Sequence, residues 1–373
     1  MALLSRTDRS QIANWWWTID RWSLAAIATL IVAGVLLTLA ASPAVAGRIG
    51  VEPLHFVYKQ LSFVAPALIV ILAVSLAGPR DVRRIALVVY VVSLLLMIAA
   101  LFVGPEIKGA HRWLLVGPFS VQPSEFAKPA FVVLAAAALA ESNRTPGFPG
   151  ALIAGFAYAA FAGLLVLQPD FGQTMLTTIV CVAMFFLAGL QWQWLTLFGA
   201  AGVGGGVGAY FFVPHVASRI DRFLTSEGDT FQVSTSLNAF TQGGFGGVGP
   251  GEGSVKFVLP DAHSDFIFAV AGEEFGLAAC TVLIVLFGVI VVRALRHAVE
   301  ERDHFVQLAA SGLATMFGLQ AVVNIAVTLS LLPAKGMTLP FVSYGGSSTL
   351  ALALTVGMLL ALTRRRAAAQ RGW

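Results

Sequence analysis

Long apolar stretches separated by short polar ones make up most of this 373-residue chain. Runs of about 20 apolar residues recur along it, the length that an α-helix needs to cross a hydrocarbon core of about 30 Å. We therefore expect an all-α polytopic membrane protein, with a single transmembrane domain over residues 22–363. The ten predicted spans are 22–46, 56–77, 85–104, 124–141, 150–167, 173–190, 193–213, 264–293, 306–331 and 342–363.

The basic residues indicate an orientation. With the N-terminus in the cytoplasm, most of the 23 Lys and Arg residues fall in inner segments, as the positive-inside rule requires. The sequence thus predicts that both termini are inside. Residues 1–21 form a cytoplasmic arm with an interfacial tryptophan belt, and 364–373 form a basic cytoplasmic tail. A large extracytoplasmic loop, 214–263, joins the seventh and eighth helices.

Composition excludes several classes of protein. The chain is 58% hydrophobic and 11% charged, whereas soluble domains carry about 25% charged residues. No basic patch interleaved with aromatic residues indicates nucleic-acid binding. Cys181 and Cys280 both fall in apolar runs, too few for a disulfide framework or a metal cluster.

Three outer segments are rich in polar residues: 105–124, 214–263 and 331–348. The predicted topology places all three on the same side of the membrane, so they can converge on one site. Gly244, Gly246 and Gly249 match the spacing of a dinucleotide-binding loop, but no strand precedes them. We interpret them as a loop that needs positive φ angles and close backbone approach.

Asp265 is the candidate chemical centre. Asp261, His263 and Asp265 are three ionisable residues just before an apolar run. A carboxylate at such a membrane boundary costs free energy unless it has a partner, so its presence there indicates a pairing or a function. Capping of the following helix is the alternative, because acidic residues also favour that position. Glu273 and Glu274, two turns further on, are interpreted as buried structural carboxylates.

Other ionisable residues also admit two interpretations. Glu125 and Lys128 share a helix face at i and i+3, so they form a local ion pair, or Lys128 reaches across to Asp265 and keeps it ionised. Arg112 beside Trp113 suits an anionic amphiphilic ligand, and suits an interfacial anchor equally well.

Three motif blocks follow one another over most of the chain: GAHRWL with QPSEFAKP, then GGFGGVGPGEGSVKFVLPDAHSDFIFAVAGEE, then LLPAKGMTLPFVSYGGSS. In this order they resemble the motifs of the SEDS (shape, elongation, division, sporulation) family of bacterial cell-wall polymerases. The lysine in PAKGMTLP is similar to that of the division-type members. Thr235 departs from the glutamine usual at its position.

The resemblance implies a ten-helix glycosyltransferase that polymerises lipid II at the outer face of the inner membrane, at the division septum. The essential aspartate of the family corresponds to Asp265, and its S-E-F-x-K motif to Glu125 and Lys128. These three are the catalytic candidates. The substrate-binding candidates are Arg112, Trp113, His263, Lys256, Lys335, Ser343 and Tyr344.

The resemblance also implies ligands and partners. The substrate is lipid II, the leaving group is undecaprenyl diphosphate, and a divalent cation (Mg²⁺ or Mn²⁺) is left open as a cofactor. A class B penicillin-binding protein of the FtsI type and other division proteins are the expected partners. The alternatives are a lipid II flippase, an elongation-type polymerase or a non-catalytic scaffold. Clustering of polar motifs at one face disfavours a continuous transport path.

Overall fold

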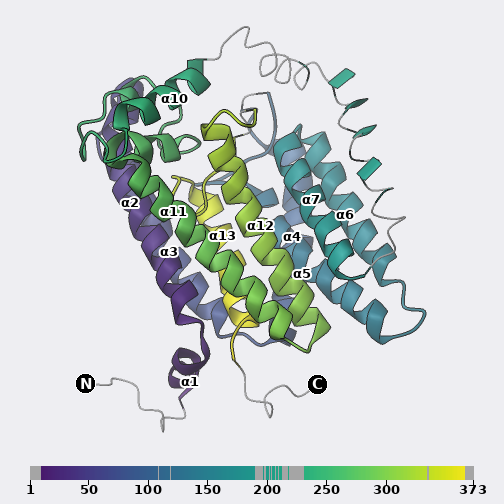
Figure 1. The fold of residues 1–373 in the computed structure, drawn as a ribbon. Coiled ribbons are helices and arrows are strands. Elements are labelled where there is room, and N and C mark those ends of the chain that lie inside the picture. The colour runs from purple at the N-terminus through teal and green to yellow at the C-terminus, as the bar shows by residue number, and fades with distance from the viewer. Residues whose placement is uncertain are drawn as a thin grey trace.

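The computed structural model describes residues 10–107, 109–117, 119–189, 231–333 and 336–365, with scattered residues between 196 and 217. Long, roughly parallel helices form a bundle, and α10 lies across one end of it (Figure 1). The described elements are α1 (Gln11–Thr18), α2 (Arg21–Ile49), α3 (His55–Ser75), α4 (Pro79–Val103), β1 (Leu114–Val116), β2 (Phe119–Val121), α5 (Pro123–Arg144), α6 (Gly150–Leu167), α7 (Phe171–Leu187), α10 (Phe231–Gly243), η1 (Val255–Phe257), α11 (Ile267–Glu300), α12 (His304–Thr328) and α13 (Gly346–Leu362).

The described helices agree with the apolar runs of the sequence. Seven of them (α2 to α6, α11 and α12) are long and apolar enough to cross a membrane, and α7 and α13 are shorter apolar helices. Each predicted span except 193–213 contains one of these nine. The span 193–213 lies largely outside the described residues.

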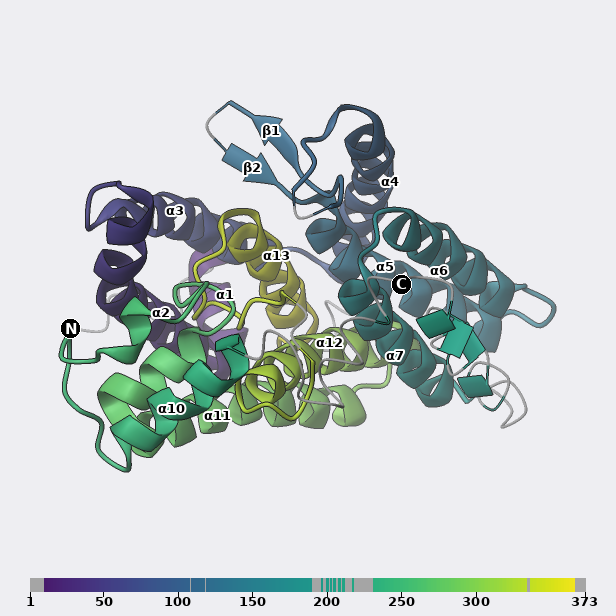
Figure 2. The same cartoon turned by 90° about the horizontal axis from the view of Figure 1, so that it is seen from above.

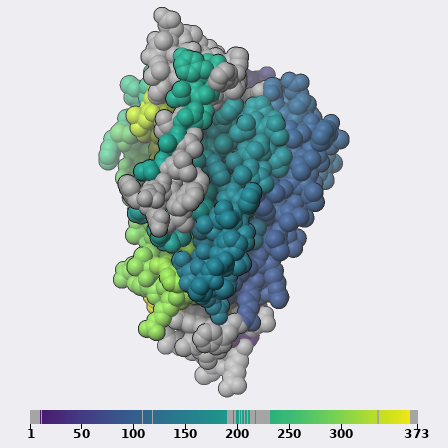
Figure 3. Space-filling model, turned by 90° about the vertical axis from the view of Figure 1, so that its right-hand side faces the viewer, coloured from purple at the N-terminus to yellow at the C-terminus, as the bar shows by residue number. Residues whose placement is uncertain are grey.

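The centre of the bundle is formed by α5, α12 and α13, whose side chains are mostly buried, whereas α3, α4 and α6 expose most of theirs. Small residues allow this close packing. A Cβ on Gly357 of α13 would lie 2.9 Å from the Cβ of Val74. In Figure 3, residues of α4 to α7 (blue to teal) form a continuous outer wall of the bundle.

The described part of the N-terminal arm, from residue 10 onward, packs against the bundle. Trp15 of α1 is buried, and its indole donates a hydrogen bond to the Ser75 hydroxyl at 2.8 Å. The backbone N–H of Arg365 donates to the Thr18 carbonyl at 3.0 Å, so the start and the end of the bundle lie side by side. The tryptophan belt is therefore partly an internal anchor.

A short β-hairpin is added to the otherwise all-helical fold, and the sequence analysis did not predict it. Strands β1 and β2 pair antiparallel, with Leu114 opposite Val121 and Val116 opposite Phe119, and the hairpin projects beside α4 (Figure 2). Phe119 packs edge-on against Phe63 of α3, with ring centroids 5.3 Å apart. Three-residue strands give too little alternation to be seen in a sequence dominated by apolar runs.

Candidate active site

The three polar outer segments meet, as the sequence predicted. The Gln122 N–H donates to the Ser347 hydroxyl at 3.1 Å, which joins the first segment to the third. The Tyr344 N–H donates to the His263 carbonyl at 2.9 Å, and the Ser343 hydroxyl donates to the Ser264 carbonyl at 2.6 Å. The third segment therefore lies between the other two.

Asp265 occupies the turn that precedes α11 and is partly exposed. The Asn324 amide of α12 donates to the Asp265 carbonyl at 3.0 Å and to the Met337 carbonyl at 2.6 Å. Gly336 lies beside the carboxylate, because a Cβ there would be 3.6 Å from Asp265 Oδ2. Main-chain contacts thus fix this residue against the third segment.

The structure places Asp265 one residue before the cap of α11. The N-cap residue is Phe266, whose side chain makes no capping hydrogen bond. The helix begins at Ile267, three residues later than the predicted span, so Asp265 lies outside it and not at the N-cap position that the capping interpretation assumed.

Lys128 belongs to a second polar cluster, buried between α5 and α7. Its ammonium lies 3.0 Å from Glu125 Oε2 and donates to Gln173 Oε1 at 2.7 Å. The Gln173 amide in turn donates to Glu125 Oε1 at 2.7 Å. The hypothesised direct pair with Asp265 is not formed, because one turn of helix brings Glu125 close and Gln173 completes the ammonium's contacts.

Arg112 is docked on the turn between α6 and α7. Its guanidinium donates to the carbonyls of Gln168 at 2.9 Å and Pro169 at 2.5 Å, and lies 3.8 Å from the Asp170 carboxylate. A quarter of the Arg112 side chain stays exposed. Trp113 beside it is partly buried. The arginine is thus anchored to the protein and remains partly accessible.

Lys256 is not placed to contact a diphosphate. It is 2% exposed, and its ammonium pairs with the Glu274 carboxylate and donates to the Gly251 carbonyl at 3.0 Å. The Glu273 carboxylate accepts from the N–H groups of Val255 at 2.6 Å and Lys256 at 3.1 Å. Both glutamates are thus buried structural carboxylates, as predicted, and Lys256 is the counterion of Glu274.

The glycine-rich loop packs into a break in α11. Gly276 has φ +73°, and the N–H of Leu277 just after it donates to the Gly244 carbonyl at 3.0 Å. On the other side of the break, the Val248 N–H donates to the Glu273 carbonyl at 2.9 Å. Gly249 has φ +116°. Positive φ angles thus account for Gly244 and Gly249, but not for Gly246, and the close backbone approach occurs at Gly247, where a Cβ would clash with the Glu274 carbonyl oxygen.

His263 and Tyr344 form an aromatic group with Phe56. The imidazole lies 4.3 Å from the Phe56 ring and 5.2 Å from the Tyr344 ring. Burial lowers the pKa of His263 to about 4, against the opposing effect of Asp261, and burial raises the pKa of Tyr344 to about 12. Both side chains are therefore neutral near pH 7, and His263 Nδ1 is buried without a hydrogen-bond partner.

The remaining candidates differ in accessibility. Ser343 is 3% exposed and accepts from the Leu339 N–H at 2.8 Å, so it shapes the third segment. Lys335 lies outside the described residues. Within the described residues, no group of three or more His, Cys, Asp or Glu side chains is placed to hold a metal ion.

Two functional candidates were missed by sequence reasoning. Gln173 completes the Lys128–Glu125 cluster, and Asn324 fixes the Asp265 main chain. Both are 5% exposed or less, and Asn324 Oδ1 has no hydrogen-bond partner. The available signal was an amide side chain in an otherwise apolar run, since a polar group there must find a partner.

Comparison with known proteins accounts for this arrangement. The profile of the FtsW/RodA/SpoVE family, described as cell cycle proteins, matches residues 21–368. A probable peptidoglycan glycosyltransferase FtsW of Caulobacter vibrioides is 46% identical over 364 residues, 97% of this chain and 93% of the relative. Stage V sporulation protein E of Bacillus subtilis is 33% identical over 347 residues, 90% of this chain and 94% of the relative.

Solved structures give the same result. A chain of the structure "Structural coordination of polymerization and crosslinking by a peptidoglycan synthase complex" is 28% identical, with a TM-score of 0.77 over 92% of this chain and 97% of that one. The rod shape determining protein RodA of Thermus thermophilus is 27% identical, with a TM-score of 0.69 over 93% and 97%. Motifs, profile and fold agree over nearly the whole chain, which is therefore a member of the FtsW/RodA/SpoVE family of membrane-embedded cell cycle proteins.

Proposed function

We propose that this protein is a peptidoglycan glycosyltransferase that polymerises lipid II during septal cell-wall synthesis, with Asp265 as general base. The observation that carries the proposal is the Asp265 turn. Its main chain is fixed by Asn324 at the meeting point of the three polar segments, and it lies before the N-cap residue of α11. The relatives named as glycosyltransferases and the motif match support the same chemistry.

The proposed topology has ten spans with both termini in the cytoplasm and the loop 214–263 outside. The hydrogen bond between Arg365 and Thr18 supports an even number of crossings between them. Nine apolar helices among the described residues account for nine of the proposed spans, and the tenth, 193–213, is proposed from its sequence alone. The Asp265 turn then lies at the outer face of the inner membrane, where lipid-linked precursors are accessible.

In the proposed reaction, the acceptor hydroxyl oxygen of one lipid II forms a bond to the anomeric carbon of another glycan. The bond from that carbon to the phosphate oxygen breaks, and undecaprenyl diphosphate leaves with the electron pair. Asp265 takes the hydroxyl proton and later releases it to water. General base catalysis of this kind contributes roughly 10²–10⁴-fold.

Residues near the motif segments would serve the leaving group. The Arg112 side chain is 25% exposed, and a guanidinium suits a phosphate, which it can bind in a bidentate manner. Lys335, one residue before Gly336 in the sequence, would also bind the diphosphate through its positive charge. A divalent cation would neutralise part of the same negative charge. The Lys128–Glu125–Gln173 cluster holds the start of α5, which carries the first motif, in register with α7.

The proposed partner is a cross-linking enzyme, a class B penicillin-binding protein, together with other division proteins at the septum. A chain of similar fold comes from a synthase complex that coordinates polymerization and crosslinking. The division assignment is supported by the similarity to relatives named FtsW. Depletion in a rod-shaped host should then give filaments, whereas rounded cells would indicate the elongation role.

The test compares two aspartates of the same turn. Asp265→Asn removes the basic carboxylate and should lower glycan synthesis from labelled lipid II by roughly 10²–10⁴-fold. Asp261→Asn is the matched control, because Asp261 has φ +51°, which asparagine tolerates. It should keep near-normal activity.

Both purified proteins are assayed with the partner present, and their thermal unfolding is compared with wild type. Near-normal polymer from a well-folded Asp265→Asn protein would contradict the assignment. Lipid II flipping is measured in the same vesicles. Flipping by wild type that is lost in Asp265→Asn would favour a transporter instead.

A further inference from the structure

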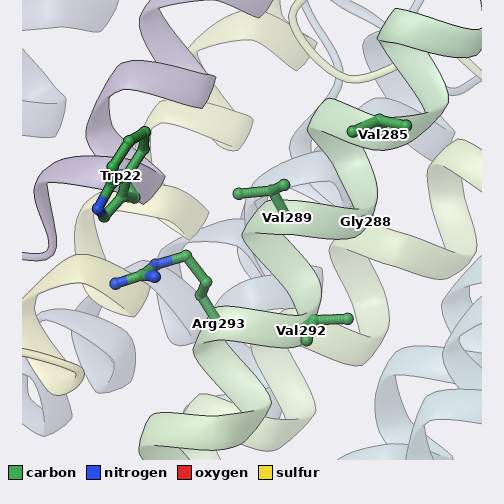
Figure 4. Close-up of a pocket in the computed structure, with 6 residues that line it drawn as sticks. All are labelled: Trp22, Val285, Gly288, Val289, Val292 and Arg293. Carbon is green, nitrogen blue, oxygen red and sulfur yellow. The ribbon is translucent and has the colours of Figure 1, made fainter.

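A groove runs between the start of α2 and the second half of α11, far from the Asp265 turn along α11. It has a volume of about 510 Å³. Figure 4 shows Trp22 on one wall, the valines of α11 on the other and Arg293 between them. Its lining is apolar except for one guanidinium: Trp22, Val285, Gly288, Val289, Val292 and Arg293.

A second, polar hollow of about 330 Å³ adjoins this groove and shares Trp22 and Arg293 with it. Arg21, Arg365 and Asp20 also line the hollow. Three guanidinium groups therefore surround one carboxylate, which leaves an excess of positive charge. Together the two spaces form one amphipathic site, apolar at one end and cationic at the other.

Asp20 does not neutralise the whole hollow. It is held in a bidentate pair by Arg293, with N–O distances of 2.7 and 2.6 Å, and its side chain is 4% exposed. The Arg21 guanidinium stacks over the Trp17 ring, 4.7 Å from its centroid. Among the described residues, no carboxylate lies within ion-pair distance of Arg21 or Arg365.

We propose that this site binds one anionic phospholipid, with its phosphate on Arg21 and Arg365 and one acyl chain in the α2–α11 groove. Guanidinium groups bind phosphate in a bidentate manner, and cationic pockets near helix ends on the cytoplasmic side bind anionic headgroups. Trp22 is 70% exposed, as a tryptophan at headgroup level would be. The assignment to the cytoplasmic leaflet rests on the proposed topology, but the binding itself does not.

Charge favours a lipid over the transmembrane helix of a partner protein. An apolar helix would fill the groove but would leave the guanidinium hollow without an anion. An anionic phospholipid occupies both spaces at once. Its polar–apolar boundary then coincides with Trp22 and Arg293, the two residues that the spaces share.

The test uses the full-length protein and two lipids that differ in charge. Native mass spectrometry after mild delipidation should show retained phosphatidylglycerol but not phosphatidylcholine. The double variant Arg21→Gln/Arg365→Gln should weaken phosphatidylglycerol retention at least tenfold. Arg296→Gln is the matched control, because Arg296 lies on α11 three residues after Arg293, with a side chain 79% exposed and paired with Glu300. It should retain the lipid as wild type does.

Gly288→Leu tests the apolar half independently. A Cβ on Gly288 meets no atom within 4 Å, so the leucine fits, fills the groove and should displace the lipid while the helix remains intact. Equal retention of both lipids, or unchanged phosphatidylglycerol retention in both site variants, would overturn the proposal. Stabilisation by inorganic phosphate alone, without lipid, would reassign the hollow to a free anion. Binding of a partner helix that is independent of lipid charge and blocked by Gly288→Leu would overturn it as well.

Discussion

Asp265 and the pair Glu273 and Glu274 lie within ten residues of each other around the start of α11, but they differ in burial and in hydrogen bonding. Glu273 and Glu274 are at most 1% exposed, and their oxygens accept from backbone N–H groups and the Lys256 ammonium. Asp265 is partly exposed and is fixed through its main-chain carbonyl. Removing one partner of a buried charge pair is strongly destabilising. A partly exposed carboxylate with a fixed main chain can be reached by a substrate, as the proposed role of Asp265 requires.

The strongest test of this contrast is Glu274→Ala. It leaves the Lys256 ammonium buried without its counterion, and removal of one partner of a buried pair costs roughly 3–5 kcal/mol. We expect a large loss of folded protein, measured by thermal unfolding in detergent. The loss of activity should follow the loss of folded protein.

Two controls accompany Glu274→Ala. Glu252→Ala changes an exposed glutamate of the same loop and should be near neutral. The double variant Glu274→Leu/Lys256→Met removes both charges and should recover much of the stability. A stable Glu274→Ala protein would show that the pair contributes little.

Lys128→Met tests whether the Lys128–Glu125–Gln173 cluster has a structural role, as Glu273 and Glu274 have, or a role in the reaction, as proposed for Asp265. The change strands Glu125 at 5% exposure, so a loss of roughly 3–5 kcal/mol in unfolding free energy is expected. Lys128→Met/Glu125→Gln should restore much of it. If the double variant folds well but remains inactive, the lysine also acts in the reaction.

The sequence predicted contacts between residues that are close in the chain better than contacts between residues that are far apart in it. The spans and the meeting of the three motif segments followed from apolar run length and topology. The Lys128–Gln173 contact joins residues 45 positions apart, and no local pattern selects that partner over Asp265. Lys256 was a substrate-binding candidate, and its polar loop gave no sign that the side chain is buried. Only the break at Gly276 and the glycines packed into it explain why it is buried.

Asn324→Leu should sharpen the contrast by displacing Asp265 without altering its charge. The leucine loses the hydrogen bonds to the Asp265 and Met337 carbonyls, at a cost of about 1–3 kcal/mol for the stranded groups. Misplacement of a reacting group also lowers the rate at saturating lipid II, here by roughly tenfold or more. Gln320→Leu is the matched control, because Gln320 lies one turn away and anchors only Thr338, at 3.2 Å.

The two amide variants should be similarly destabilised, and the rate should fall only for Asn324→Leu. The rate is measured as glycan synthesis against lipid II concentration. A change in KM alone, or equal losses of rate in both variants, would assign Asn324 a purely structural role.

The smallest expected effect concerns the neutral imidazole beside this turn. Burial lowers the pKa of His263 to about 4 from 6.5, so the folded state binds fewer protons than the unfolded state between these values. Stability is therefore complete above about pH 6.5 and falls as the pH drops toward 4. The loss at pH 6 is about 1 kcal/mol, and it rises to about 3 kcal/mol near pH 4.

His263→Phe keeps the packing against Phe56 and Tyr344 and cannot titrate, so its unfolding temperature should depend less on pH over this window than that of wild type. His297→Gln, at the opposite end of α11, is the control. Parallel pH profiles for wild type and His263→Phe would mean that the imidazole is hydrated and keeps an ordinary pKa.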